Sequence, residues 1–416
     1  MNGRAVGVRK LRSIRALLGP AVIVSVAYID PGNFGSNISA GAKFGMSLLW
    51  VVWLSGFLAI LFQYLSGKLG LARGYSVFEE MMLRIEGLGI LSKPLKILYF
   101  TSTFIMILAT DMAELTGMVV GIALLLNIPL EIALPIAFLD IIVLFIALER
   151  AGRLHEIIAV LVGVVGFSLL YELHIVGVDF IEVIRSSITI SSLSGEISIY
   201  ATAIIGATIM PHALLLHSYL SRDEWRTQED PSRALRKHLK DTLLYLSIAS
   251  LLNAALQVLS YYAFYIHGMH DVNAETAYYI LKPLYGALAS YVFGIALLAS
   301  GLSSSLVSIQ VGVNIFESFF SKHMSMWRVR FMIRIINLIP FTIAILIGFN
   351  VIELLVYTQV VLSIYLPLVL LPLTLITSSH RLMGSLRNSR IVSALALIFS
   401  IVIILINAAL LTIFSS

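Results

Sequence analysis

Cysteine is absent from this 416-residue chain, which excludes disulfide bonds, thiolate metal sites and catalysis by a thiol. Charged residues are scarce as well: they make up 12% of the chain, whereas soluble domains carry about 25%. In their place, hydrophobic residues make up 59% of the chain, and the mean hydropathy is +0.96. This composition predicts an all-α, polytopic membrane protein.

Apolar runs of about 17–25 residues mark helices that cross a bilayer. The sequence contains eleven such runs, several of them longer than a membrane requires. They cover residues 18–39, 46–70, 95–126, 129–148, 155–175, 197–220, 241–267, 284–318, 329–348, 351–376 and 391–414. The first run follows five basic residues, as the apolar core of a signal peptide would. It contains Asp30 and lacks a small-residue cleavage site, so we interpret it as a retained first helix.

The distribution of lysine and arginine tests this number of spans, because cytoplasmic loops are enriched in both residues. If the N-terminus lies in the cytoplasm and the spans alternate, 25 of the 28 basic residues fall in cytoplasmic segments. Only Lys43, Arg185 and Lys282 fall outside. We therefore expect a cytoplasmic N-terminus and an extracellular C-terminus. The isoelectric point of 9.3 then reflects basic loops and does not indicate nucleic-acid binding.

A short internal repeat divides the chain. The segment AYIDP at residues 27–31 aligns with ATIMP at residues 207–211, 180 residues later, and both interrupt an apolar run with proline. Matching broken helices in two halves of a membrane protein indicate the binding site of a transporter. Five spans per half is an odd number, so the two halves must enter the membrane from opposite sides. The predicted organisation is a cytoplasmic tail (1–17), two inverted repeats (18–175 and 197–376) and an additional span (391–414).

The first break combines groups that suit a cation. On insertion scales, placing an aspartate such as Asp30 at the centre of a membrane helix costs about 2.5–3.5 kcal/mol of free energy. Such residues normally face an interior cavity. Pro31 removes a backbone donor and Gly32 permits unusual dihedral angles, so the helix should unwind and free carbonyls near Ala27. Asn33 adds an amide oxygen. The same four residues outside a membrane would more often form a turn.

The second break adds a soft ligand. Met210 supplies a thioether, and the carbonyl near Ala207 should be freed by the proline that follows. A mixture of oxygen and sulfur ligands favours late or borderline transition metals over Ca²⁺ and Mg²⁺. Taken singly, Met210 is more often a packing residue and His212 a hydrogen-bonded interior histidine; the repeat of both breaks is what favours a binding site.

At these residues the chain resembles the Nramp family of divalent metal transporters. The family's motif in span 1, Asp-Pro-Gly-Asn, stands at residues 30–33, and its motif in span 6, Met-Pro-His, stands at residues 210–212. Matching stretches also lie at residues 110–117 in span 3 and 359–367 in span 10. The resemblance covers most of the chain. It implies a LeuT-like inverted repeat of five plus five helices with one additional helix, in which helices 1 and 6 are unwound at mid-membrane.

The resemblance also implies a function. Nramp proteins are proton-coupled importers of Mn²⁺ and Fe²⁺ that often accept Co²⁺ and Cd²⁺ and work by alternating access. The metal-binding positions that the resemblance implies are Asp30, Asn33, Met210, the carbonyls of Ala27 and Ala207, and Gln359. Relatives that carry Mg²⁺ or Al³⁺ lack this methionine, so its presence argues against those ions. One departure lies in span 8, where Leu302 stands in place of the family's usual glutamine.

A route for protons is predicted beside the metal site. Asp111 and Glu114 are three residues apart and share one face of span 3, and acids inside a membrane mark proton relays. His212 titrates near neutral pH unless its environment changes that. We expect protons to pass from Asp30 and His212 to these acids and then towards the cytoplasm. The candidate partners of the acids are Arg330 and Arg334 in span 9; a static ion-pair network between spans 3 and 9 is the alternative.

Other functions remain open from the sequence. A Na⁺-coupled amino-acid symporter of the same fold is the main alternative. The binding site of such a symporter uses helix N-termini and backbone carbonyls and does not need an aspartate facing a methionine. An intramembrane metal-dependent hydrolase or a channel is less favoured, and we expect no enzymatic activity and no resident cofactor. The expected partners are the transported metal ions, protons and the lipid bilayer, with no nucleic acid, and we expect a monomer. The expected location is the plasma membrane of a prokaryote.

Overall fold

The computed structural model describes residues 20–141, 154–193, 195–225, 231–272, 287–322 and 325–415, and these residues are almost entirely helical. The first half holds α2 (Pro20–Ala27), α3 (Pro31–Phe44), α4 (Leu49–Arg73), α5 (Val77–Glu86), α6 (Ser92–Leu126), α7 (Leu130–Ala137), α9 (Leu154–Val176) and α10 (Phe180–Ile188). The second half holds α11 (Glu196–Ile209), α12 (Pro211–Trp225), α13 (Pro231–Ala263), α15 (Ala287–Phe320), α16 (Met326–Leu346), α17 (Val351–Tyr365), α18 (Pro367–Ser378), α19 (His380–Met383) and α20 (Arg390–Ser415). No strand occurs in these ranges.

Eight of the predicted spans correspond to described helical stretches that are long and apolar enough to cross a membrane, two of which are divided between two helices, α11 with α12 and α17 with α18. The predicted run at residues 18–39 is instead divided between α2 and α3, neither of which is long enough alone. The run at 155–175 belongs to α9, which with α10 forms a pair bent by 111° that can serve as a ninth span. The run at 129–148 begins as α7, but residues 142–153 lie outside the described part.

The polar segment at residues 221–240 is more helical than its composition predicts. That composition predicts a cytoplasmic loop with one short helix, but α12 continues to Trp225 and α13 begins at Pro231. Proline is favoured at the first position of a helix, where its missing N–H is not needed. The described parts of this segment therefore lengthen the two neighbouring helices.

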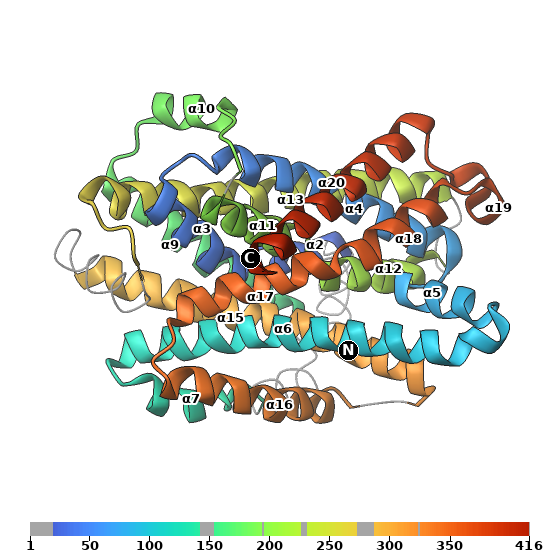
Figure 1. The fold of residues 1–416 in the computed structure, drawn as a ribbon, viewed down its shortest axis with the longest axis horizontal. Coiled ribbons are helices and arrows are strands. Elements are labelled where there is room, and N and C mark those ends of the chain that lie inside the picture. The colour runs from blue at the N-terminus through green and yellow to red at the C-terminus, as the bar shows by residue number, and fades with distance from the viewer. Residues whose placement is uncertain are drawn as a thin grey trace, which may run out of the picture.

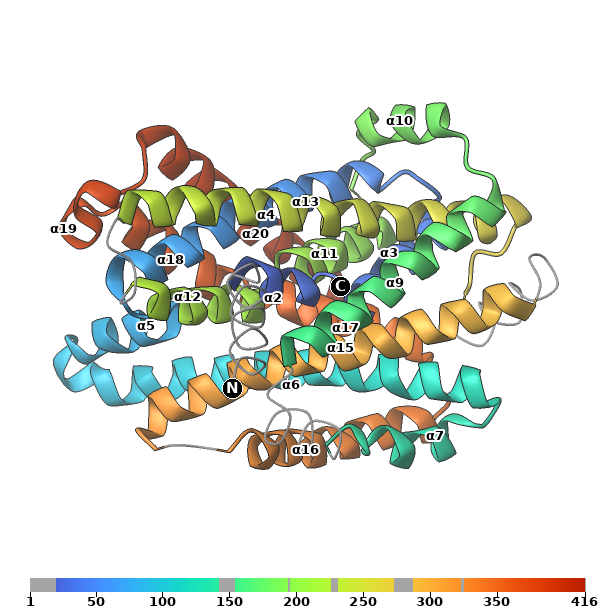
Figure 2. The same ribbon diagram turned by 180° about the vertical axis from the view of Figure 1, so that it is seen from behind.

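The broken helices lie at the centre of the bundle. α3 packs against α13, α17 and α11, and α2 packs against α13, α15 and α12. In Figures 1 and 2, α7 and α16 lie together at one edge, outside α6, and α10 and α20 lie towards the opposite edge. Buried apolar side chains fill the space around the breaks, in one cluster that includes Tyr28 and Met210 and another that includes Ile29 and Phe34.

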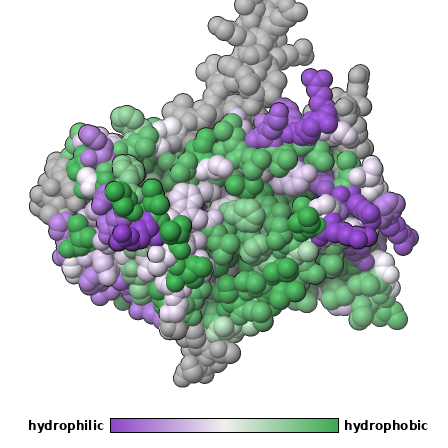
Figure 3. All heavy atoms as spheres, turned by 90° about the horizontal axis from the view of Figure 1, so that it is seen from above, coloured by the Kyte–Doolittle hydropathy of each residue, from purple (hydrophilic) through white to green (hydrophobic). Residues whose placement is uncertain are grey.

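The surface matches a protein immersed in lipid. Large apolar side chains are exposed on many helices, among them Leu405 of α20 at 62% and Phe167 of α9 at 71%. Figure 3 shows a broad hydrophobic region across the middle of one face, with hydrophilic residues gathered towards its two ends. Exposure of so wide an apolar surface to water would be unfavourable, whereas the hydrocarbon core of a bilayer can cover it.

Candidate functional site

The first break is shaped by Asp30 and Pro31. α2 ends at Ala27, and Asp30 has an extended backbone (φ −99°, ψ 164°) that turns the chain into α3. The Asp30 carboxylate caps α3, since its Oδ1 accepts hydrogen bonds from the backbone N–H and the side-chain Nδ2 of Asn33, both at 2.8 Å. An aspartate before proline at the first helical position is a favourable helix start. The residues that interrupt the span therefore also begin its second half.

The second break is a single residue long. α11 ends at Ile209, and Met210 has φ 40° and ψ 97°, outside the helical region. A positive φ is uncommon for a residue with a side chain. The N–H of Met210 still donates to the Gly206 carbonyl at 3.3 Å, and α12 begins at once at Pro211. Proline thus ends one helix and starts the next at both breaks.

Asn33 joins the two breaks. Its Nδ2 lies 3.0 Å from the carbonyl oxygen of Ala207 and 3.2 Å from that of Tyr28, and it donates to these acceptors as well as to Asp30. In return, the hydroxyl of Thr208 donates to the Oδ1 of Asn33 at 3.5 Å. Residues 174 positions apart in the chain are therefore in direct contact at the point where both helices lose their regular hydrogen bonding.

Gln359 of α17 also reaches this junction. Its side-chain amide lies against Gly32, so closely that a Cβ on Gly32 would overlap it. The Nε2 of Gln359 donates to Thr358 at 3.3 Å, but its Oε1 has no hydrogen-bond partner among the described residues. A buried amide oxygen without a partner is costly and is free to accept a ligand.

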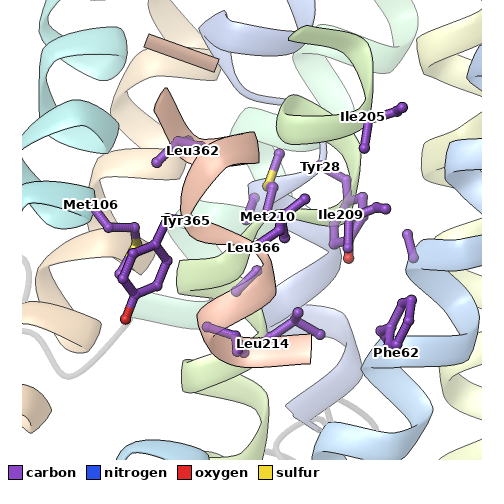
Figure 4. Close-up of a cluster of buried hydrophobic side chains, with 14 of the residues drawn as sticks. Tyr28, Phe62, Met106, Ile205, Ile209, Met210, Leu214, Leu362, Tyr365 and Leu366 are labelled. Atoms are coloured by element: carbon purple, nitrogen blue, oxygen red, sulfur yellow. The ribbon is translucent and has the colours of Figure 1, made fainter. Parts of the chain in front are cut away.

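All six predicted metal-binding residues are buried. Asp30 is 1% exposed, and the other five (Ala27, Asn33, Ala207, Met210 and Gln359) are 0% exposed. Figure 4 shows Met210 in the middle of an apolar cluster, with Tyr28 and Ile209 on one side and Leu362 on the other. The junction is thus closed to solvent, and its thioether packs as a core residue does.

The groups at the junction form a mixed donor set: one carboxylate, two side-chain amide oxygens, backbone carbonyls and one thioether. Such a set can hold a divalent cation through oxygen and offer it a soft sulfur ligand. No group of three or more His, Asp or Glu side chains suited to a metal occurs anywhere in the described ranges. A metal at the junction would depend on the aspartate, the amides and the methionine.

A second polar site lies between α6, α16 and the segment after α7. The Nη1 of Arg330 lies 2.5 Å from Asp111 and 3.4 Å from Glu114, and its Nη2 lies 2.7 Å from Asp140. Arg334 lies 3.2 Å from Asp111 and 2.9 Å from Asp140. All five side chains are at most 2% exposed. We call Asp111, Glu114, Asp140, Arg330 and Arg334 the ion-pair cluster.

Glu114 is the acid least engaged by the arginines. Besides the long contact with Arg330, its two oxygens accept hydrogen bonds from Ser304 at 3.1 Å and from Ser308 at 2.7 Å, both on α15. Asp111, by contrast, contacts both arginines and also accepts a hydrogen bond from Asn337 at 2.8 Å.

His212 connects the breaks to α6. The Nδ1 of His212, in the first turn of α12, lies 3.3 Å from the hydroxyl of Thr110, the residue before Asp111. Its Nε2 has no hydrogen-bond partner among the described residues. No hydrogen bond in the described structure joins His212 to Asp30 or to either acid of α6. The structure therefore links His212 to α6 through Thr110, and within the described ranges it contains no continuous chain of hydrogen bonds from Asp30 to the two acids.

Three residues of these sites were missed or misassigned from the sequence. From the sequence, Asp140 in span 4 is interpreted as a partner in hydrogen bonds between helices, whereas in the structure it pairs with both arginines. The sequence feature that could have identified Asp140 is a carboxylate within an apolar run, as for Asp111. Ser304 and Ser308 were not predicted, because serine is common in membrane helices and carries no charge to mark it.

Ser300 of α15 also has an unpredicted contact at the first break. Its hydroxyl donates to the carbonyl of Ile29 at 2.7 Å. This carbonyl cannot join the regular hydrogen bonding of a helix because the helix has ended, so Ser300 satisfies a group that the break leaves free. Leu302, which stands in place of the family's glutamine, packs against an apolar cluster that includes Leu115.

Comparison with known proteins places these features in a family. Residues 21–412 match the family profile described as natural resistance-associated macrophage protein-like (Nramp). A divalent metal cation transporter MntH of Granulibacter bethesdensis is 36% identical over 397 residues, covering 94% of this chain and 87% of the relative. The MntH of Caldanaerobacter subterraneus is 34% identical over 410 residues, covering 97% and 94%.

Solved structures agree with this match. The Eremococcus coleocola manganese transporter, solved in complex with an aromatic bis-isothiourea substituted compound, has a TM-score of 0.84 and 28% identity. The alignment covers 94% of this chain and 84% of that one. Mhp1, a nucleobase-cation-symport-1 family transporter, has a TM-score of 0.58 at 12% identity over 86% of this chain, a likeness of fold alone.

Proposed function

Because the chain belongs to the Nramp family, as its motifs predicted, we propose that it moves divalent transition metal ions across a membrane together with protons. The preferred ions are Mn²⁺ and Fe²⁺, with Co²⁺ and Cd²⁺ also accepted. The metal is the cargo rather than a resident cofactor. The bacterial relatives named as divalent metal cation transporters and the solved manganese transporter support this assignment.

The observation that carries the proposal is the contact between the two breaks. Asn33 bonds to Asp30 on its own side of the junction and to the Ala207 carbonyl on the other, which gathers ligands from both halves of the chain. A site built from two broken helices is typical of secondary transporters, in which one half moves against the other around a fixed binding point. The burial of all six candidate ligands fits a state in which the site is closed on both sides.

The arrangement of the chain in the membrane follows from this function. We propose eleven spans: a LeuT-like pair of inverted five-helix repeats and an additional span, with α2–α3 and α11–α12 as the two spans broken at mid-membrane. The N-terminus is cytoplasmic and the C-terminus extracellular, in the plasma membrane of a prokaryotic cell, and the protein acts as a monomer. The distribution of basic residues supports this orientation.

The charge of the ion-pair cluster supports proton coupling. The cluster holds three carboxylates and two guanidinium groups, so with every acid ionised it would carry one net negative charge while fully buried. A buried charge without a counter-ion is strongly unfavourable, and the binding of one proton removes it. Glu114 is the carboxylate least engaged by the arginines, so we propose that it holds this proton and that His212 and Asp30 exchange protons with it.

The rival functions lack comparable support. An amino-acid symporter would need space for an organic substrate, whereas Gln359 and Asn33 fill the junction. A metal-dependent hydrolase would need several His or acid ligands at one point and a base beside them, and His212 is the one histidine at the breaks. The members of this family named here are transporters, and the chain is not an enzyme.

Reconstitution in liposomes tests the proposal. We expect saturable uptake of Mn²⁺ that increases when the outside is acidic, little uptake of Ca²⁺ or Mg²⁺, and none of amino acids. Asp30→Ala should abolish Mn²⁺ uptake because it removes the only carboxylate of the junction. Glu131→Gln, which changes an exposed carboxylate of α7 away from the junction, is the matched control and should transport normally. Absence of Mn²⁺ uptake, or full uptake by Asp30→Ala, would refute the proposal.

A further inference from the structure

The short helix α10 stands apart from the bundle. It follows α9 after a bend of 111°, so it cannot continue that span in the same direction. In Figures 1 and 2 it lies at the edge of the molecule, outside the packed helices, and the chain passes from it to α11. Its nine residues are enough for two and a half turns, and they have three distinct faces.

One face of α10 is apolar and exposed. Phe180, Ile181, Ile184 and Ile188 follow the spacing of one side of a helix, and each is 65–77% exposed. Ile190, just beyond the helix, is 76% exposed as well. No other described part of the chain covers these side chains. Five large apolar residues within eleven positions would be an unfavourable surface in water.

A second face of α10 is fixed to the protein by hydrogen bonds. The carboxylate of Glu182 accepts from the hydroxyl of Tyr261 at 2.7 Å and from that of Tyr262 at 2.8 Å. The indole N–H of Trp53 donates to the hydroxyl of Ser187 at 2.9 Å. These contacts fix the rotation of the helix about its axis. The apolar face therefore always points away from the protein.

The third face is polar and free of the bundle. Arg185 lies next to the apolar face on the helix surface, and Thr189 follows the last residue of the helix; both are exposed. An arginine at the edge of an apolar face can place its stem along lipid and its charge among phosphates. Aromatic residues with a polar end, such as the tyrosines and tryptophan that hold α10, gather at the level of lipid headgroups.

We propose that α10 lies in the headgroup region of the outer leaflet, with Phe180, Ile181, Ile184 and Ile188 inserted among the acyl chains. An amphipathic helix with one apolar face and a basic residue at its margin binds a membrane surface in this way. Figure 3 shows a broad hydrophobic region across the middle of one face of the molecule, which is the surface that a bilayer would cover. A lipid surface is favoured over a protein partner because the face is small, convex and edged by a cation. The assignment to the outer leaflet rests on the proposed topology.

The segment that follows α10 is attached to α4. Trp50 donates to the hydroxyl of Ser191 at 3.1 Å, and that hydroxyl donates to the Ser47 carbonyl at 2.7 Å. Insertion of α10 would therefore also fix the nearby end of α4 relative to the membrane surface.

The absence of cysteine makes a direct test simple, since every introduced cysteine is unique. Ile184→Cys is labelled with a nitroxide, the protein is placed in liposomes of phosphatidylethanolamine and phosphatidylglycerol, and collisions with oxygen and with a water-soluble nickel chelate are measured. Thr189→Cys, at the exposed polar residue just after α10, is the aqueous control, and Leu405→Cys on the exposed side of α20 is the lipid control. We expect the label at 184 to collide with oxygen several times more than with nickel, as at 405, and the label at 189 to show the reverse.

Two other results would overturn the proposal. Equal nickel access at 184 and 189 would mean that the apolar face is open to water. Low access to both reagents would mean that a protein covers it, and spin–spin broadening would then identify a second copy of this chain. The measurement does not require transport, so the inactive Asp30→Ala background gives the same answer and separates this proposal from the proposed function.

Discussion

At the scale of single residues, Met210 combines two roles that are difficult to separate. It packs in an apolar cluster with Tyr28 and Leu366, and it occupies the non-helical position between α11 and α12. Burial alone would explain a methionine there, since its flexible side chain fills irregular spaces. The positive φ at Met210 marks the end of α11, three residues after Ala207, whose carbonyl accepts a hydrogen bond from Asn33.

A Met210→Leu variant distinguishes the two roles. Leucine keeps the apolar volume, and such exchanges usually cost less than about 1.5 kcal/mol of stability, but it removes the sulfur ligand. We expect the preference for Cd²⁺ over Ca²⁺ to fall by about tenfold or more, since tenfold corresponds to about 1.4 kcal/mol of relative affinity. Competition of each ion against Mn²⁺ uptake in liposomes measures this. An unchanged preference would leave Met210 as a packing residue only.

Glu114 is the residue on which proton coupling depends. A Glu114→Gln change keeps the hydrogen bonds to Ser304 and Ser308 possible but removes the exchangeable proton. We expect metal-driven acidification of the liposome interior to fall at least severalfold while the protein stays folded, because the amide is neutral in every state. Glu131→Gln on the exposed side of α7 is the control and should leave proton flux unchanged. Full proton flux in Glu114→Gln would favour a static ion-pair network.

At the scale of helices, the breaks need partners from neighbouring elements. Proline and aspartate end α2, but the carbonyl that this end leaves free is satisfied by Ser300 from α15. The second break is steadied in the same way from α3, through the bond of Asn33 to Ala207. Each interruption is therefore stabilised by a helix distant in sequence.

A Ser300→Ala variant measures this support. Loss of the hydroxyl leaves the Ile29 carbonyl buried without a donor, which costs about 1–3 kcal/mol. We expect a lower midpoint of thermal unfolding in detergent and weaker metal binding. Ser318→Ala, on the same helix, removes only a bond to its own turn, at Asn314, and should change stability by less than about 0.5 kcal/mol. Equal effects of the two changes would contradict a special role for Ser300.

Helices and breaks were largely predictable from the sequence, whereas their partners were not. Apolar length indicates a span, and proline after a buried Asp30 indicates an interruption, because both depend on neighbouring residues in the chain. The pairing of Asp140 with Arg330 depends on which helices are adjacent, and no local pattern contains that information. α10 was missed for another reason: it is short, and its exposed isoleucines resemble part of a membrane span until the bend after α9 is seen.

At the scale of the whole molecule, an ion pair joins the two broken helices at the ends that face outward in the proposed topology. Lys43, at the end of α3, lies 2.7 Å from Glu196, at the start of α11, and 3.7 Å from Asp271. Between this pair and the breaks lies an apolar layer that includes Phe34 and Ile38. Opening towards the outside must separate these contacts.

A Lys43→Met variant should favour the outward-open state. The pair is partly exposed, and such ion pairs contribute about 0.2–1 kcal/mol, so the open population should rise by about fivefold at most. A cysteine placed at Ala203, which is fully buried in α11, would report this as faster reaction with a water-soluble thiol reagent. Lys96→Met, which removes a pair with Glu86 remote from the breaks, is the control. An unchanged rate in Lys43→Met would show that the apolar layer alone closes the outer side.

The ion-pair cluster also has a consequence for how the protein enters the membrane during synthesis. Arg330 and Arg334 lie on α16, and each costs about 2.5–3.5 kcal/mol at the centre of a lone helix in lipid. Their acidic partners lie on α6 and just after α7, some two hundred residues earlier, and reach the membrane first. A carboxylic acid can become neutral in lipid by binding a proton, whereas an arginine side chain stays charged. We therefore expect α16 to remain at the translocation machinery until α6 is beside it, so that the arginines meet their acidic partners before α16 faces lipid alone.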